Sequence, residues 1–328
     1  MTDPDAHLFI LTGASRGMGL AMARQLLVPG HTVLTLSRLP SDDLARHAES
    51  AGAGLTQWSV DLADSAPVAE RLSAWLGEFD VGQFASANLI NNAGVIPAIG
   101  PLRDADGLDL ANALRVGLEA PMLLTAAFLG ATRDWRGVRK VLNISSGLGR
   151  RAMASQAAYC AAKAGMDHFT RCLALDEAPL AHGAKVCSLA PGVIDTDMQV
   201  QLRGADAQAF PDRANFEQLK SGGQLISPDE AARRAGLSGT PGLRCRAGGR
   251  CARLTRRHRP YYGLNSCLRT TRKRWRPFWL KNPPLNTPAA RSSPAAPDAA
   301  RSPGCACAAA APPRAARLPR RAVATAGG

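Results

Sequence analysis

The stretch that decides the fold is HLFILTGASRGMGLAMARQLL, residues 7–27, close to the start of the chain. An apolar run over 7–11 has the length of a buried strand, and an amphipathic pattern typical of a helix covers 17–28. Between them lie Gly13, Gly17 and Gly19, which permit a tight turn and a close approach of the backbone to a ligand. The pattern predicts a strand, a glycine-rich turn and a helix in direct succession.

Further short apolar runs follow at 32–37, 55–60, 89–91, 138–144 and 184–189. Amphipathic stretches of helical length separate them, the clearest at 156–178. Near-continuous apolar strands that alternate with helices are typical of a parallel sheet covered on both faces. We therefore expect an α/β fold, a Rossmann-type doubly wound parallel sheet flanked by helices.

The charge is divided unevenly along the 328 residues. Residues 1–230 hold 19 Lys/Arg and 25 Asp/Glu, whereas residues 231–328 hold 21 Lys/Arg and one acid, a net charge of +20. The second segment is rich in Arg, Ala, Pro and Gly, and it has too little apolar surface to offset the entropy of ordering its backbone. We expect one folded domain over 1–232 and a basic, disordered tail over 233–328.

The sequence around residue 230 contains a contradiction. Ser227, Pro228 and Glu230 form a good helix start signal, but the helix that follows runs into Gly and Pro within two turns. Arg, Ala, Pro and Gly share GC-rich codons, so our hypothesis is a frameshift near residue 233. Resequencing of the locus tests it, since an intact single frame in independent isolates would refute it.

Membrane and secreted classes are excluded by the patterning. The longest apolar run, 120–131, is far shorter than the roughly 20 residues that span a bilayer. Acids stand near the N-terminus where a secretory signal carries Lys or Arg. Cys160, Cys172 and Cys187 lie in apolar stretches and predict buried thiols in a reducing compartment, so we expect a cytoplasmic protein. Cys305 and Cys307 are too close together for a zinc knuckle, and we expect no metal site.

The glycine-rich turn predicts a dinucleotide site, because the N-terminus of the next helix offers free N–H groups and a positive dipole to phosphates. An ordinary strand–helix turn is the alternative. Enzymes that select NAD place an acid at the end of the second strand, but here Arg38 ends it and Arg16 lies in the turn. Two guanidinium groups suit a 2′-phosphate, so NADP(H) is expected as the cofactor unless both arginines are merely solvated.

Tyr159, the single tyrosine of residues 1–232, lies four residues before Lys163 in YCAAK. On a helix these side chains share a face, and a nearby ammonium would lower the pKa of the phenol, which favours acid–base chemistry. Ser146 follows a predicted strand, where ligands bind in such sheets. A chance Tyr-x-x-x-Lys pair and a plain strand-end turn are the alternatives.

Taken in order, TGASRGMG, NNAG at 91–94, Ser146, YCAAK and PGVIDT at 191–196 resemble the short-chain dehydrogenase/reductase family. The resemblance covers about 7–232 and is strongest to its sepiapterin reductase and benzil reductase branch. It implies that Tyr159 donates a proton to a carbonyl oxygen, that Ser146 orients that carbonyl, and that Lys163 binds the nicotinamide ribose and lowers the Tyr159 pKa.

The glycine-rich turn, the two arginines and the resemblance together define a cofactor-binding set. Its members are Gly13, Ser15, Arg16, Gly17, Gly19, Arg38, Asp61, Leu62, Asn91, Ala93, Gly94, Tyr159, Lys163, Pro191, Gly192 and Thr196.

Two departures from the family pattern stand out. Gly117 occupies the position where the family usually has an Asn that holds a water of the proton relay. The family's sheet also ends in a seventh strand, and we expect none here, because nothing after residue 235 supplies one. That absence would expose an edge of the sheet.

The expected function is NADP(H)-dependent reduction of a small ketone, diketone or pterin-like carbonyl compound. Residues 197–225 are expected to cover the substrate. The apolar side chains predicted to form this pocket are Met198, Val200, Leu202, Phe210 and Phe216. The resemblance implies a homodimer or tetramer that pairs through 108–131 and 156–178. One alternative is a catalytically impaired nucleotide-binding protein whose basic tail binds nucleic acid non-specifically; another is a folded enzyme inactivated by loss of the seventh strand.

Overall fold

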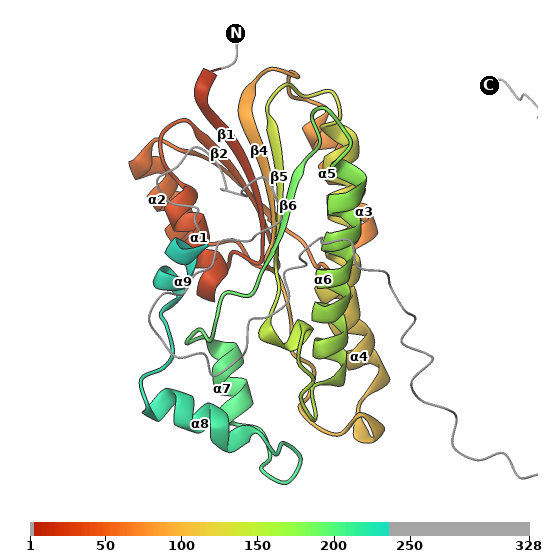
Figure 1. Ribbon diagram of the computed structural model, residues 1–328. Helices are drawn as coiled ribbons and strands as arrows, with labels where there is room; N and C mark the ends of the chain where they lie inside the picture. The colour runs from red at the N-terminus through yellow and green to blue at the C-terminus, as the bar shows by residue number, and fades with distance from the viewer. Residues whose placement is uncertain (1–2, 236–328) are drawn as a thin grey trace, which may run out of the picture. The chain divides into compact units, whose positions relative to one another are not determined.

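A six-stranded parallel sheet forms the centre of the computed structural model, which describes residues 3–235 (Figure 1). The strand order is β3-β2-β1-β4-β5-β6, so the chain reverses direction across the sheet between β1 and β4. The Rossmann-type doubly wound fold is confirmed. The strands are β1 (Asp3–Thr12), β2 (His31–Ser37), β3 (Gly54–Ser59), β4 (Phe84–Asn91), β5 (Val138–Ile144) and β6 (Lys185–Leu189).

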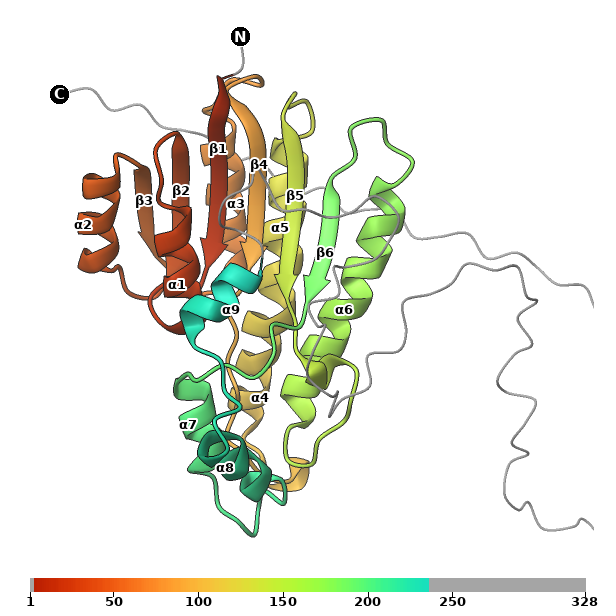
Figure 2. The same ribbon diagram turned by 60° about the vertical axis from the view of Figure 1, so that its left-hand side comes forward.

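Helices cover both faces of the sheet (Figure 2). One face carries α1 (Gly17–Leu26), α2 (Asp42–Ala51) and α9 (Pro228–Arg234). The other face carries α3 (Ser65–Leu76), α5 (Ala120–Ala131) and α6 (Ala157–Glu177). The remaining elements are η1 (Leu102–Asp104), α4 (Gly107–Leu114), the π-helical segment η2 (Arg115–Glu119), η3 (Gly147–Gly149), α7 (Asp197–Arg203) and α8 (Arg213–Ser221).

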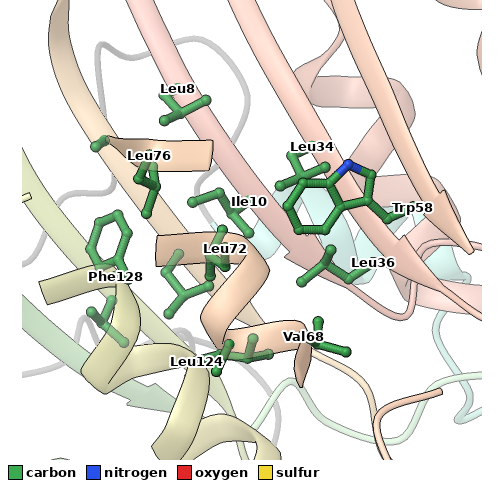
Figure 3. Packing of buried hydrophobic residues seen from close by; sticks show 14 of the residues in the cluster. Leu8, Ile10, Leu34, Leu36, Trp58, Val68, Leu72, Leu76, Leu124 and Phe128 are labelled. Carbon is green, nitrogen blue, oxygen red and sulfur yellow. The ribbon is translucent and has the colours of Figure 1, made fainter. Parts of the chain in front are cut away.

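The core follows the alternation of side chains along the strands. Leu8 and Ile10 of β1 point to one face and pack with Leu72 of α3 and Phe128 of α5 (Figure 3). Phe9 and Leu11, which alternate with them, pack on the opposite face with α1, α2 and α9. Because both faces are apolar, β1 reads as a continuous apolar run, and this is why the sequence revealed it.

The strand β4 begins five residues earlier than the apolar run at 89–91 indicated. Ser86 and Asn88 hide the earlier part of the strand in the sequence, because polar residues are unusual in a buried strand. Both are buried and paired: the Ser86 hydroxyl contacts His7 Nδ1 at 3.0 Å, and the Asn88 amide donates to the Leu8 carbonyl at 3.0 Å.

The continuous helix from α4 through η2 to α5 is long and apolar enough to cross a membrane by length and composition alone. Ala120, Leu124 and Phe128 of this helix are buried and pack against α3 and the sheet. The helix is therefore a core helix of the α/β domain.

The helix predicted to start at Ser227 is present as α9, and the Ser227 hydroxyl accepts a hydrogen bond from the Glu230 N–H at 3.2 Å. It ends at Arg234, and Ala231, Ala232 and Ala235 are buried in the cluster that includes α1. Ala235, assigned from the sequence to the tail, thus packs against the domain. Three predictions concern residues outside 3–235: the disorder of the later tail, its nucleic-acid binding and the missing seventh strand. Within residues 3–235, β6 pairs with β5 alone.

Cys160, Cys172 and Cys187 form no disulfide within residues 3–235. The expectation that all three are buried was wrong. Cys172 is exposed on α6, and the other two are half-buried.

Candidate active site

A cavity of about 1000 Å³ lies at the carboxyl edge of the sheet. Every strand contributes lining residues from just beyond its end, and the strands point toward α7 and α8 (Figure 2). Ligands of open parallel sheets bind at this edge, beside the point where the strand order reverses. All the predicted site residues except Asn91 line this one cavity.

The glycine-rich turn has no room for side chains at two of its three glycines. A Cβ on Gly19 would lie 1.9 Å from the carbonyl oxygen of Gly13, and a Cβ on Gly13 would lie 2.9 Å from Ala93 Cα. Gly13 also has a φ of 72°. The N-cap residue Arg16 makes no side-chain capping bond within the described residues, so the first N–H groups of α1 remain open to a bound phosphate.

The ends of β2 and β3 form one end of the cavity, with Arg38, Asp61 and Leu62 in its lining. Arg38 is exposed, and no carboxylate between residues 6 and 235 pairs with it. Arg16 instead makes an exposed ion pair with Asp197, at 3.0 Å, that joins the glycine-rich turn to α7. An exposed pair of this kind contributes about 0–1 kcal/mol, so Arg16 is readily released to another anion.

Ser146, Tyr159 and Lys163 all line this cavity. A hydrogen bond joins the side chains of Ser146 and Tyr159. Lys163 is fully buried on the next turn of α6; its ammonium donates to the Ile144 carbonyl at 2.8 Å and lies 5.8 Å from the centroid of the Tyr159 ring. The end of β5 and the start of α6 thus hold a hydroxyl, a phenol and an ammonium in one place.

The pKa of Tyr159 is raised, mainly because burial disfavours the phenolate; the hydrogen bond from Ser146 opposes this, and the nearby Cys160 adds to it. The prediction that the Tyr159 pKa is lowered by Lys163 was therefore wrong. Burial lowers the pKa of Lys163 to about 8, and the charge of Asp167 opposes that shift. Tyr159 consequently keeps its proton at neutral pH, which suits a proton donor.

A family model described as short chain dehydrogenase matches residues 7–207. The chain belongs to this family. It is 35% identical to benzil reductase ((S)-benzoin forming) of Bacillus cereus, over 68% of this chain and 90% of that protein. It is 32% identical to sepiapterin reductase of Meriones unguiculatus, over 69% of this chain and 88% of that protein.

A metagenomic short-chain oxidoreductase, solved in complex with NADP, is similar in structure, with a TM-score of 0.54 and 27% identity over 70% of this chain and 89% of that one. The chain is an oxidoreductase of the short chain dehydrogenase family, which uses NAD(P) as cofactor. The glycine-rich turn, the open N-terminus of α1 and the lining of the cavity fit such a dinucleotide. Two buried oxygens in that lining, Ser145 Oγ and Gln199 Oε1, have no hydrogen-bond partner within residues 3–235.

Asn91 does not line the cavity, and the prediction that it does was wrong. Its amide donates to Thr125 Oγ1 at 3.1 Å and to Asn143 Oδ1 at 2.8 Å, so it ties β4 to β5 and α5 inside the domain. The next residue, Asn92, lines the cavity instead, and its amide donates to the carbonyls of Thr12 and Gly13. The alternation of side chains at the end of a strand was the signal that could have separated the two.

Gly117 lies in the π-helical segment and is buried against α6. A Cβ at this position would lie 3.0 Å from the Cβ of Ala162, the residue before Lys163. One turn along, a Cβ on Gly165 would lie 2.8 Å from Leu118. Glycine at position 117 therefore allows η2 to pack closely against the part of α6 that carries Lys163, where an Asn side chain would be crowded.

A buried carboxylate, missed from the sequence, lies one helical turn from Lys163. Asp167 follows Lys163 by one turn of α6 and accepts a hydrogen bond from the Ser188 hydroxyl at 2.5 Å. Its other oxygen lies 3.2 Å from Nε of Arg150, a half-exposed residue that lines the cavity. The i, i+4 spacing of charged groups on a helix was its sequence signal.

The segment from α7 to α8 forms a cover with a small core of its own. Leu202, Phe210 and Phe216 pack there with residues that include Ile96 and Met153. A parallel bridge between Ile194 and Ile226 closes the base of the segment.

Of the five apolar residues predicted to form the substrate pocket, Met198, Leu202 and Phe216 line the cavity. Val200 and Phe210 do not. Val200 is 59% exposed, and Phe210 is fully buried in the core of the cover, so both predictions were wrong.

Proposed function

We propose that the protein is an NADP(H)-dependent carbonyl reductase that acts on a small ketone, diketone or pterin-like carbonyl compound. The observation that carries this proposal is the hydrogen-bonded Ser146 and Tyr159, with Lys163 one turn away, in the same cavity as the glycine-rich turn. A bound dihydronicotinamide supplies hydride to the carbonyl carbon. The chain itself supplies position and a proton.

In this proposal Ser146 donates a hydrogen bond to the carbonyl oxygen and orients it. Tyr159 gives its proton to the same oxygen as the alcohol forms. The raised pKa of Tyr159 keeps that proton in place until it is needed. Lys163, fixed to the Ile144 carbonyl, holds a positive charge near the phenol and binds the ribose of the cofactor.

The dinucleotide would lie with its phosphates at the N-terminus of α1 and its adenosine between Arg38 and the Asp61–Leu62 pair. Arg38 supports the choice of NADP(H), because it lines the cavity and no carboxylate between residues 6 and 235 neutralises it. Pro191, Gly192 and Thr196 would hold the nicotinamide, since they line the cavity after β6.

The relatives support the substrate class. Benzil and sepiapterin both carry a small reducible ketone, and the chain covers about nine-tenths of a protein named for each. The cavity has Met153, Met198, Leu202 and Phe216 in its lining, which suits an apolar or aromatic substrate.

The catalytic domain proposed here runs from residue 1 to about 232, extended to 235 by the buried end of α9. We expect it to pair with a second copy through α4, α5 and α6. Leu108, Leu114, Met122 and Leu175 support this, because all four are exposed apolar side chains on those helices. The thiols without disulfides support a reducing, cytoplasmic setting.

The test is oxidation of NADPH, followed by absorbance, by the full chain with benzil and with sepiapterin. Turnover is expected, and Tyr159→Phe should lower it at least 100-fold while NADPH binding is retained. Equal turnover by Tyr159→Phe would refute the role of the phenol. An absence of turnover with a wide panel of ketones would refute the reductase.

A further inference from the structure

Gln156 is a buried amide in the lining of the cavity, directly before α6 and one turn before Tyr159. Its side chain is 1% exposed, and neither Oε1 nor Nε2 has a hydrogen-bond partner within residues 3–235. It does not cap α6 with its side chain either. An unpaired buried amide is destabilising, so its place beside the proposed proton donor points to a ligand group that completes it.

The backbone before Gln156 is strained and anchored. Ser155 has a φ of 62°, the only positive value at a non-glycine residue in the described part of the chain. Its hydroxyl donates to the Ala209 carbonyl at 2.5 Å, which ties the start of α6 to the cover over the cavity. A left-handed conformation is unfavourable for a residue with a side chain. The fold thus holds Gln156 in place against both backbone strain and an unpaired amide.

We infer that Gln156 binds a second hydrogen-bonding atom of the substrate, next to the carbonyl that is reduced. This inference rests on the proposed function, since Tyr159 and Ser146 must hold the reacting oxygen. Gln156 stands three residues before Tyr159 and lines the same cavity, so in this inference its amide faces the atom next to the reacting carbonyl.

The chemistry of the amide defines the substrate class. Its N–H groups suit an acceptor, either the second oxygen of a vicinal dicarbonyl or a ring nitrogen beside a ketone. A compound with a single carbonyl and no neighbouring acceptor leaves the amide unpaired. A site built to make a hydrogen bond discriminates against the analogue that lacks the partner atom.

Benzil and deoxybenzoin provide a matched pair of probes, because both carry two phenyl groups and deoxybenzoin has a methylene in place of the second carbonyl. In Gln156→Met, which keeps the volume of the side chain, the ratio of kcat/KM for benzil to that for deoxybenzoin should fall about tenfold, the effect of one hydrogen bond in a buried site. Gln156→Glu keeps the shape but removes the N–H donor, and the same ratio should fall. Gln208→Met, at an exposed position on the cover, is the control.

Sepiapterin is the second arm and carries a ring nitrogen beside its ketone. If Gln156→Met lowers kcat/KM for benzil alone, the amide binds dicarbonyls. If it lowers kcat/KM for sepiapterin alone, the amide binds the heterocycle. Either result supports the inference. An equal loss for all three compounds, accompanied by a lower melting temperature, assigns Gln156 a structural role and overturns it. So does an unchanged ratio for every probe. A protein that reduces none of them refutes the proposed function instead.

Discussion

The two ends of the cavity are built in different ways. The end at α1 is made of backbone: Gly13 and Gly19 touch other main-chain atoms, and the N-terminus of the helix is open. The end at α7 and α8 is made of side chains from separate segments, among them Gln156 and Met153, under a cover with its own small core.

This difference teaches where tolerance and specificity lie. Where the surface is made of backbone, an added side-chain atom clashes with the main chain, whereas the identity of the neighbouring side chains matters little. A surface of side chains can be altered residue by residue, and it carries the unpaired amide of Gln156. We therefore expect substitutions at the first end to abolish binding and substitutions at the second to change rates or preferences.

The largest effect is expected from Gly19→Ala. The added methyl group would lie 1.9 Å from the Gly13 carbonyl oxygen, so the turn must move. Dinucleotide binding should weaken more than 100-fold, and the free energy of unfolding should fall by about 2–4 kcal/mol. Calorimetric titration with NADPH and urea unfolding measure the two effects.

Gly100→Ala is the matched control, since a Cβ there meets nothing within 4 Å. It should change stability by less than about 0.5 kcal/mol. Near-normal cofactor binding by Gly19→Ala would contradict the view that backbone contacts build this end.

Lys163→Met should separate stability from activity. Turnover should fall about 100-fold. The lowered pKa of Lys163, about 8 in the fold against 10.5 for the free side chain, means that the fold resists its protonation. This penalty, about 3 kcal/mol, is fully present below pH 8 and disappears as the pH rises toward 10.5.

Removal of the ammonium also loses its bond to the Ile144 carbonyl, so the net gain in unfolding free energy at pH 7 should be about 1–2 kcal/mol. Urea unfolding at pH 7 and at pH 10 checks it, with exposed Lys185→Met as the control. If the stabilisation by Lys163→Met were larger at pH 10 than at pH 7, the lowered pKa of Lys163 would be contradicted.

Arg38→Asp tests whether a single side chain at the proposed adenosine end of the cavity selects the cofactor. If Arg38 contacts the 2′-phosphate, as proposed, its replacement should shift the ratio of kcat/KM for NADPH to that for NADH by about 10–100-fold toward NADH. Arg133→Asp makes the same change of charge at an exposed position outside the lining of the cavity. If both variants keep the preference of the unaltered protein, Arg38 does not select the cofactor.

The smallest effect is expected from Asp167→Asn. Its negative charge raises the pKa of Lys163, so its removal should move the loss of the ammonium, and the alkaline fall of kcat/KM, to lower pH. Activity at pH 8 should drop about three- to tenfold, with less change at pH 6. Arg150 also contacts Asp167, and the Asn oxygen can still accept from Ser188. Asp176→Asn, exposed on the same helix, is the control.

The sequence predicted the elements and the residues whose signal is local. The glycine-rich turn lies within seven residues, and the Tyr159–Lys163 pair lies within one turn of a helix. Gln156 was missed because its burial depends on the cover, through the contact of Ser155 with Ala209, more than 50 positions away. The raised pKa of Tyr159 was missed for the same reason, since spacing along a helix shows the neighbouring charge but not the depth of burial.

The position of α9 has a practical consequence. Its buried alanines pack against α1, the helix that follows the glycine-rich turn, and the Gln25 amide donates to the Asp229 carbonyl at 3.0 Å. A chain cut before residue 228 would leave that side of α1 facing water. The shortest chain that keeps α1 covered must therefore extend to Ala235.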